Sequence, residues 1–185
     1  MRRYLSWFLI LSAGAVDAET MTYAFEWHGG EGYTLKGAME YQSEAVTGRF
    51  VTAQDLTCFV IEGRMEDTPL GRWALTMRNE ETTWRLHFDP LTDSFLVDGQ
   101  GIWMPQAWNM NGEGNNCGPD GFGFNIGNAA QDICLDNTLI LESQAQPDRP
   151  FPAVRVSRYE FPRDACNAPA LLGHLQGEAG FLMLR

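Results

Sequence analysis

Lysine is almost missing from this sequence, which has one lysine, Lys36, against twelve arginines. Gly37 and Ala38 follow Lys36, so the chain has no G-x-x-x-x-G-K-[ST] phosphate-binding loop. The G-x-S-x-G nucleophile elbow and the H-E-x-x-H zinc helix are also absent. A glycine-rich start, "GEGNNC" at 112–117, has Cys117 where a dinucleotide fingerprint needs its third glycine. We therefore expect no nucleotide or metal cofactor, and no catalytic motif predicts an enzyme.

Long hydrophobic runs are lacking as well. The longest, from Trp7 to about Val16, is much shorter than the ~20 residues that span a bilayer. Arg2 and Arg3 precede this run and small residues follow it, which is the pattern of a secretory signal peptide. We predict cleavage after Ala18, with Ala15 as the alternative. Segment 1–18 is then a signal peptide, and the product is periplasmic or extracellular, without membrane insertion.

The remaining residues, 19–185, are long enough for one sizeable core and predict a single domain. They carry 11 basic and 23 acidic side chains, a net charge of about −12. A surface this acidic repels nucleic acid and anionic lipid headgroups. Neutral glycans, cations and basic envelope proteins remain compatible partners.

Four cysteines lie in the exported part of the chain. An even number in an oxidising compartment favours two disulfides over a metal or redox site, because no C-x-x-C spacing occurs. Three pairings are possible. Since Cys117 and Cys134 flank one loop, we expect Cys117–Cys134 and therefore Cys58–Cys166.

Alternation with a period of two recurs along the chain and predicts strands separated by turns. In 22–27, for example, Tyr23, Phe25 and Trp27 share one face. The segment 83–99 predicts a hairpin that turns at Pro90–Asp93. Only short helical turns are expected, in 127–135 and 168–175. The predicted fold is an all-β, antiparallel sandwich or barrel-like domain of roughly 9–11 strands, stapled by disulfides. The predicted strands are 22–27, 33–41, 46–52, 56–65, 72–78, 83–89, 94–97, 138–143, 153–161 and 180–185.

The segment 103–125 is the main candidate for a binding site. It combines aromatic residues with amide side chains, a set that suits a neutral, polyhydroxylated ligand such as a glycan. The alternative is that its aromatic residues form a small satellite core under a long loop. The candidate ligand-binding residues are Trp103, Trp108, Asn109, Asn111, Asn115, Asn116, Asp120, Phe122 and Asn125.

Function therefore rests on three hypotheses. The first is a non-catalytic module that binds a neutral ligand at 103–125. The second is a structural or protein-interaction domain of the cell envelope. The third is a small hydrolase, which needs two facing carboxylates drawn from Glu26, Glu40, Glu62, Asp89 and Glu113. Oxygen ligands for calcium are also present in the second half of the loop, at Asp120, Asn125, Asp132, Asp136 and Asn137.

Overall fold

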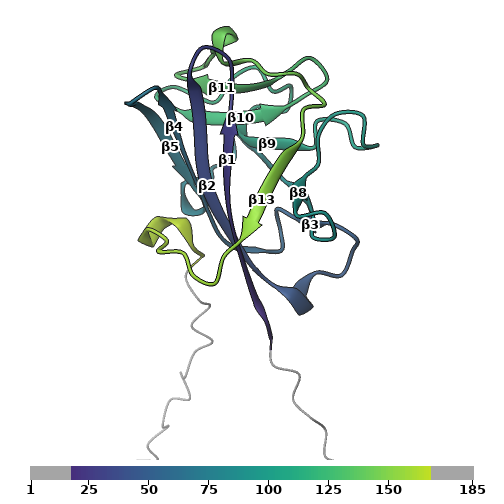
Figure 1. Ribbon diagram of the computed structural model, residues 1–185. Coiled ribbons are helices and arrows are strands. Elements are labelled where there is room, and N and C mark those ends of the chain that lie inside the picture. The colour runs from purple at the N-terminus through teal and green to yellow at the C-terminus, as the bar shows by residue number, and fades with distance from the viewer. Residues whose placement is uncertain (1–17, 168–185) are drawn as a thin grey trace, which may run out of the picture.

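The computed structural model describes residues 18–167. In this part of the chain thirteen strands form two antiparallel sheets (Figure 1). The predicted all-β, sandwich-like class is confirmed. The strands outnumber the expected nine to eleven because the predicted strand 83–89 divides into two and because three strands form where none was expected, at Gln106–Met110, Phe122–Ile126 and Gln131–Leu135. The predicted signal peptide up to Asp17, the helical segment 168–175 and the strand 180–185 lie outside the described residues.

The larger sheet has eight strands in the order β3-β7-β8-β13-β1-β2-β4-β5. Its long strands β1, β2 and β4 pair along most of their length, with Tyr23 opposite Met39 and Met39 opposite Phe59. The bounds are β1 (Thr20–His28), β2 (Tyr33–Gln42), β3 (Val51–Thr52), β4 (Leu56–Met65), β5 (Thr68–Ala74), β7 (His87–Asp89), β8 (Ser94–Phe95) and β13 (Phe151–Arg155).

The smaller sheet has five strands in the order β12-β11-β10-β9-β6. Figure 1 shows its strands running across the upper ends of the long strands β1 and β2. The bounds are β6 (Thr83–Arg85), β9 (Gln106–Met110), β10 (Phe122–Ile126), β11 (Gln131–Leu135) and β12 (Thr138–Leu139).

Within residues 18–167 the helical content consists of four 3-10 turns of three residues each. They are η1 (Ser43–Ala45), η2 (Leu75–Met77), η3 (Leu141–Ser143) and η4 (Arg163–Ala165). The predicted helical turn in 127–135 is wrong: Gln131 and Ile133 alternate with Asp132 and Cys134, and the segment pairs with β10 as strand β11. Alternation in the predicted strand 72–78 places Met77 on the inward face with Trp73 and Leu75, but Met77 is 45% exposed because β5 ends before η2. No helix among residues 18–167 is long and apolar enough to cross a bilayer.

Aromatic side chains fill the space between the sheets. Trp108, on β9, is fully buried, and its ring centroid lies 5.0–6.0 Å from those of five phenylalanines. These come from both sheets: Phe25, Phe59, Phe95, Phe124 and Phe151. Trp108 is therefore the centre of the core.

The chain crosses from one sheet to the other at Leu86. The predicted strand 83–89 divides there, because β6 pairs with β9 in the smaller sheet whereas β7 pairs with β8 in the larger. The buried side chain of Gln106 bridges this crossing. Its Nε2 donates to the carbonyls of His87 (2.7 Å) and Leu96 (2.9 Å), and its Oε1 accepts from the backbone N–H of His87 (3.2 Å) and from Trp108 Nε1 (3.3 Å).

Two glycines make room for the ring of Phe122, the first residue of β10. Gly63 and Gly71 are direct partners on β4 and β5. A Cβ at Gly63 would lie 2.3 Å from the Phe122 ring, and one at Gly71 would lie 2.7 Å from it. Contacts this short are not tolerated, so any larger residue would displace the ring. The glycine pair thus fixes how β10 sits against the edge of the larger sheet.

The segment 159–167 covers part of the outer face of the larger sheet. Ala165 packs on Ala38, Val60 and Ala74, which form one row across β2, β4 and β5. The Cys58–Cys166 disulfide joins this segment to β4, as predicted. Arg72 also donates two hydrogen bonds to Asp164, at 2.7 and 2.6 Å.

Candidate functional site

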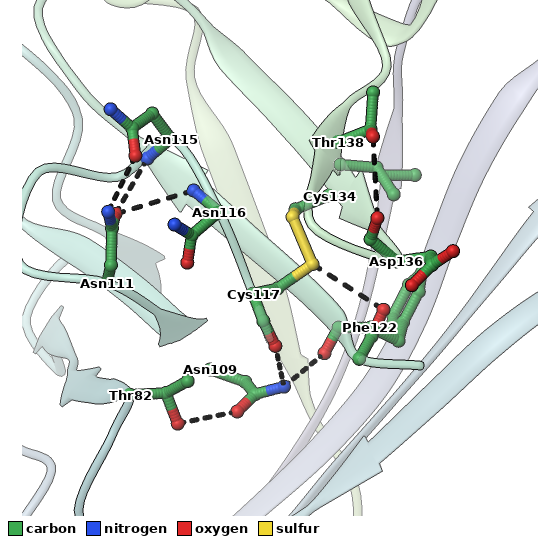
Figure 2. The surroundings of a disulfide bond; sticks show 12 residues. Thr82, Asn109, Asn111, Asn115, Asn116, Cys117, Phe122, Cys134, Asp136 and Thr138 are labelled. Atoms are coloured by element: carbon green, nitrogen blue, oxygen red, sulfur yellow. Dashed lines mark hydrogen bonds between the residues drawn. A yellow bond between two sulfur atoms is a disulfide. The ribbon is translucent and has the colours of Figure 1, made fainter. Parts of the chain in front are cut away.

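The loop between β9 and β10 lies against the outer face of the smaller sheet. The Cys117–Cys134 disulfide, the second predicted pair, joins the loop to β11 with a Cα–Cα distance of 5.9 Å (Figure 2). Around the disulfide, Met104, Ala107 and Met110 form a small buried cluster separate from the main core. The disulfide therefore holds the loop on the sheet, and the loop buries the side chains of this cluster.

The aromatic residues of the predicted site do not gather on one surface. Trp108 and Phe122 belong to the main core, with exposed fractions of 0% and 3%. Trp103 is 61% exposed, and the Arg85 guanidinium lies 5.7 Å from its ring centroid. Trp103 is thus an isolated exposed indole. The glycan hypothesis needs exposed aromatic rings, and Trp108 does not supply one, because alternation turns it toward the core.

Three of the predicted asparagines bond to one another. Asn111 Oδ1 accepts the backbone N–H groups of Asn115 (2.9 Å) and Asn116 (3.4 Å), and Asn111 Nδ2 donates to Asn115 Oδ1 (2.6 Å). These bonds shape the turn at the tip of the loop (Figure 2). Side chains of this type commonly cap turns in the same way. We assign them a structural role.

Asn109 and Asn125 fix the loop to the sheet from below. Asn109 is 5% exposed and has a left-handed φ of 55°, and its Nδ2 donates to the carbonyls of Phe122 (2.9 Å) and Cys117 (3.4 Å). Asn125 is 4% exposed, and its Nδ2 donates to the Gly114 carbonyl (3.3 Å) and to Asp132. Both amides therefore link β9 and β10 to the covering loop.

Asp132 is a carboxylate buried beneath this loop. It is 4% exposed and is the cross-strand partner of Asn125. Burial raises the pKa of its carboxyl from 3.8 to about 6, even though hydrogen bonds from Gln144 and Asn125 lower it. The Asp132 carboxylate bonds to the amide side chains of Asn125 and Gln144 and not to a second carboxylate. It therefore does not form the acid pair of a hydrolase.

The raised pKa of Asp132 predicts a pH-dependent gain from Asp132→Asn. Between about pH 4 and 6 the folded state binds more protons at this site than the unfolded chain, so the carboxyl contributes progressively less stability as pH rises. Above pH 6 the penalty is complete. In denaturant unfolding, we expect the free energy of unfolding of the variant, relative to that of the wild type, to increase by about 2 kcal/mol between pH 4 and pH 7. A stability difference that stays constant across this range would contradict the buried, ionisable state.

A cleft of about 230 Å³ opens beside the disulfide-bonded loop. One side is formed by residues 117–121 and the other by residues of the segment 77–82, which begins at the last residue of η2. Three residues of the predicted site line it, namely Asn109, Asp120 and Phe122. Sequence reasoning missed the lining residues from the opposite side, which include Trp73, Asn79, Glu81 and Thr82.

Hydrogen bonds within the protein fix both sides of the cleft. Asn79 Oδ1 accepts the backbone N–H groups of Glu81 and Thr82, each at 2.9 Å. Thr82 Oγ1 in turn donates to Asn109 Oδ1 at 2.7 Å (Figure 2). The turn "RNEETT" at 78–83 carries the sequence signal for this arrangement, an asparagine followed by polar residues before a strand. Nothing in the sequence places it opposite Cys117.

The indole N–H of Trp73 has no hydrogen-bond partner. Trp73 is 2% exposed, and Trp73 Nε1 and Trp84 Nε1 are the buried side-chain polar atoms of residues 18–167 without a partner. Leaving such a donor unpaired costs about 1–3 kcal/mol. Trp73 lines the cleft, whereas Trp84 lines a separate groove with Arg85 and His87. Trp73 is therefore the residue with an unpaired, buried donor that lines this cleft.

The charges around the cleft disfavour anions. Arg72 lines it, but Asp164 at 2.6 Å and Glu62 at 3.7 Å neutralise its guanidinium. The hydrogen bond from Arg72 lowers the pKa of the Asp164 carboxyl and keeps it ionised. Glu81 and Asp120 also line the cleft, and no ion pair between described residues involves either of them. The cleft therefore has an excess of negative charge.

The oxygen-rich residues after Cys117 do not converge on a metal site. Across residues 18–167, no group of three or more His, Cys, Asp and Glu side chains is placed to hold an ion. Asp136 instead accepts the backbone N–H of Asp120 (3.0 Å), and Asn125 bonds to Asp132. These residues stabilise turns and strand pairs.

Comparison with known proteins adds no further assignment. No protein-family model, curated protein or solved structure matches the chain. The candidate site therefore rests on the residues themselves.

Proposed function

We propose that the protein is an exported, non-catalytic binding module that holds one unit of a neutral, hydroxyl-bearing ligand, such as a glycan, in the cleft beside the Cys117–Cys134 loop. The observation that carries the proposal is Trp73, which lines this polar cleft and whose buried indole N–H has no hydrogen-bond partner within the protein. Buried donors without partners are rare in native proteins and commonly mark a position filled by water or ligand.

The lining of the cleft suits one sugar ring. Its volume of about 230 Å³ is below the ~300–1,000 Å³ of pockets for drug-sized ligands. Trp73 and Phe122 supply apolar lining, while Asn79, Thr82 and Asn109 supply amide and hydroxyl groups. Such a mixture matches a ring that has an apolar face and hydroxyls around its edge. The excess of negative charge favours a neutral sugar over an acidic one.

The disulfide fixes one side of the cleft in the absence of ligand. Cys117 is tied to β11, and Gly118, Pro119 and Gly121 follow it along the edge of the cleft. A loop fixed in advance avoids much of the ordering cost of binding. The two disulfides also indicate an oxidising compartment. The signal-peptide pattern of residues 1–18 supports export to such a compartment.

The proposal predicts that Trp73→Phe weakens binding. Phenylalanine keeps most of the packing but removes the N–H, so we expect affinity for a neutral sugar to fall about fivefold to tenfold. Calorimetric titration with glucose, galactose, mannose and N-acetylglucosamine is the measurement, and glucuronate serves as the anionic comparison.

Trp84→Phe is the matched control, because it removes the other unpaired indole N–H from a ring that packs 5.0 Å from that of Trp73, while Trp84 itself lines a different groove. It should leave sugar affinity unchanged. Equal losses of affinity in the two variants would show that the effect comes from the core and not from the cleft.

A protein-interaction role is the second candidate, and an exposed apolar strip favours it. Val154 is 67% exposed and Tyr159 is 38% exposed. With Ala24 and Pro152 they line a shallow depression of about 460 Å³ on the outer face of β13 and β1. The strip is continuous with the row formed by Ala38, Val60 and Ala74, because Ala24 pairs with Ala38. Segment 159–167 covers that row.

A further inference from the structure

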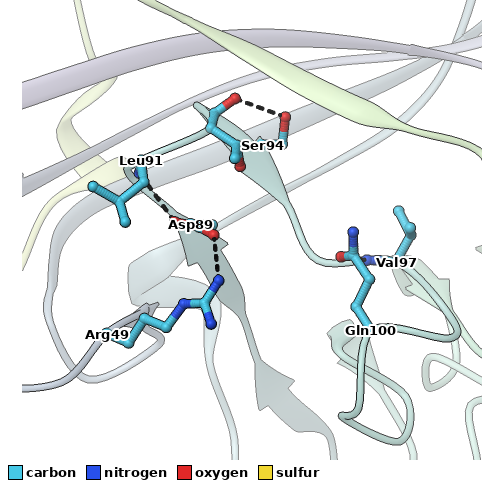
Figure 3. A network of polar contacts seen from close by, with 7 residues as sticks. Arg49, Asp89, Leu91, Ser94, Val97 and Gln100 are labelled. Atoms are coloured by element: carbon cyan, nitrogen blue, oxygen red, sulfur yellow. Dashed lines mark hydrogen bonds and ion pairs between the residues drawn. The ribbon is translucent and has the colours of Figure 1, made fainter.

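A second pocket, of about 260 Å³, lies at the other edge of the larger sheet, near β3, β7 and β8. Phe50, Phe95 and Leu96 supply its apolar lining. Its polar lining comes from Arg49, Asp89, Thr92, Ser94 and Gln100, some of which Figure 3 shows. None of these residues lines the cleft beside the disulfide-bonded loop.

The carboxylate of Asp89 is the fixed element of this pocket. Asp89 is 6% exposed, and its Oδ1 accepts the backbone N–H of Leu91 at 3.0 Å (Figure 3). The Asp89 carbonyl also accepts the N–H of Thr92, at 3.3 Å. The turn after β7 thus holds the carboxylate in place and leaves Oδ2 for a cation.

Arg49 occupies that position from the surface. Its Nη2 lies 3.4 Å from Asp89 Oδ2, and its guanidinium carbon lies 4.8 Å from the centroid of the Phe50 ring. The Arg49 side chain is nevertheless 70% exposed. Exposed ion pairs contribute only about 0–1 kcal/mol, so little free energy holds this guanidinium in the pocket.

A buried carboxylate beside an aromatic ring is a typical receptor for a guanidinium or ammonium group. We propose that this pocket binds such a group from a cationic ligand, and that Arg49 is an internal competitor that the ligand displaces. The net charge of −11 attracts cations to the protein. Ser94 Oγ donates to the Thr92 carbonyl and keeps its lone pairs for an incoming N–H.

The test compares ethylguanidinium with ethylurea, its neutral counterpart, in NMR titrations of the purified protein that follow the amide signals of Leu91 and Ser94. Ethylguanidinium should shift both signals and ethylurea should not. In Arg49→Ala the competitor is gone, so affinity for ethylguanidinium should rise about fivefold. In Asp89→Asn binding should be lost, although asparagine still accepts the Leu91 N–H and preserves the turn.

Arg85→Ala is the matched control, because Arg85 is another arginine over an aromatic ring, Trp103, and its removal changes the net charge equally. It should not raise the affinity. An acetylated Gly-Arg-Gly amide identifies the source of the cation: tighter binding than ethylguanidinium indicates an arginine of a partner protein, and equal binding indicates a small cation. If Asp89→Asn binds ethylguanidinium like the wild type, or Arg49→Ala binds it no more tightly, the proposal is wrong.

Discussion

Gln106→Met should destabilise the protein by about 4 kcal/mol. Methionine has nearly the same length and volume, so the core stays filled while four hydrogen bonds disappear. The backbone N–H of His87, the Leu96 carbonyl and the indole N–H of Trp108 would then be buried without these partners. Each unsatisfied group costs about 1–3 kcal/mol. Denaturant unfolding monitored by circular dichroism measures the loss.

Gln100→Met is the matched control for this prediction. Gln100 is exposed and makes one hydrogen bond, from the backbone N–H of Val97 to its Oε1 at 3.0 Å. Its replacement should cost about 1 kcal/mol, because one hydrogen bond is lost instead of four. Equal losses in both variants would contradict the bridging role of Gln106 at the crossing between the sheets.

Removing the loop disulfide with Cys117→Ser and Cys134→Ser should cost about 3 kcal/mol in the chain-entropy model. Without the bond, the glycine-rich segment before Phe122 regains many conformations in the native state as well. We therefore expect a melting temperature lower by about 6–12 °C and protease cleavage first within 112–121. Thermal melting and mass spectrometry of early fragments are the measurements.

The other disulfide provides the comparison. Cys58→Ser with Cys166→Ser should also lower the melting temperature, because that bond closes a separation of 108 residues. Its first cleavage sites should lie in 159–167 and leave 112–121 intact. Early cleavage at the same site in both double variants would show that the Cys117–Cys134 bond has no special role in holding the loop.

The sequence predicted the long strands well. The bounds expected for β4, 56–65, match the structure, and the alternation in β1 correctly placed Tyr23, Phe25 and Trp27 inside. Local periodicity suffices in β1, because the large aromatic side chains of that strand all lie on the core face. The crossing at Leu86 could not be predicted, because 83–89 alternates without a break. Its division depends on pairing with β9 and β8, which are distant in sequence.

The candidate site was predicted only in part. Composition pointed to the loop, and Asp120 and Asn109 do line the cleft. Most of the chosen asparagines bond within the protein instead, because the amide groups that suit a sugar also suit turns. The opposite side of the cleft, at Asn79 and Thr82, depends on tertiary packing. Trp73 was expected to face inward, but an unpaired indole N–H is visible only in three dimensions.

The indole N–H signal of Trp73 tests the central claim most directly. In a ¹⁵N-labelled sample the signal can be assigned by its disappearance in Trp73→Phe. Titration with the four neutral sugars should shift it in at least one case, with saturation, and by more than the signal of the neighbouring Trp84 indole, while glucuronate has little effect. If none of the neutral sugars moves the Trp73 signal, the cleft is not their binding site and the proposed function is contradicted.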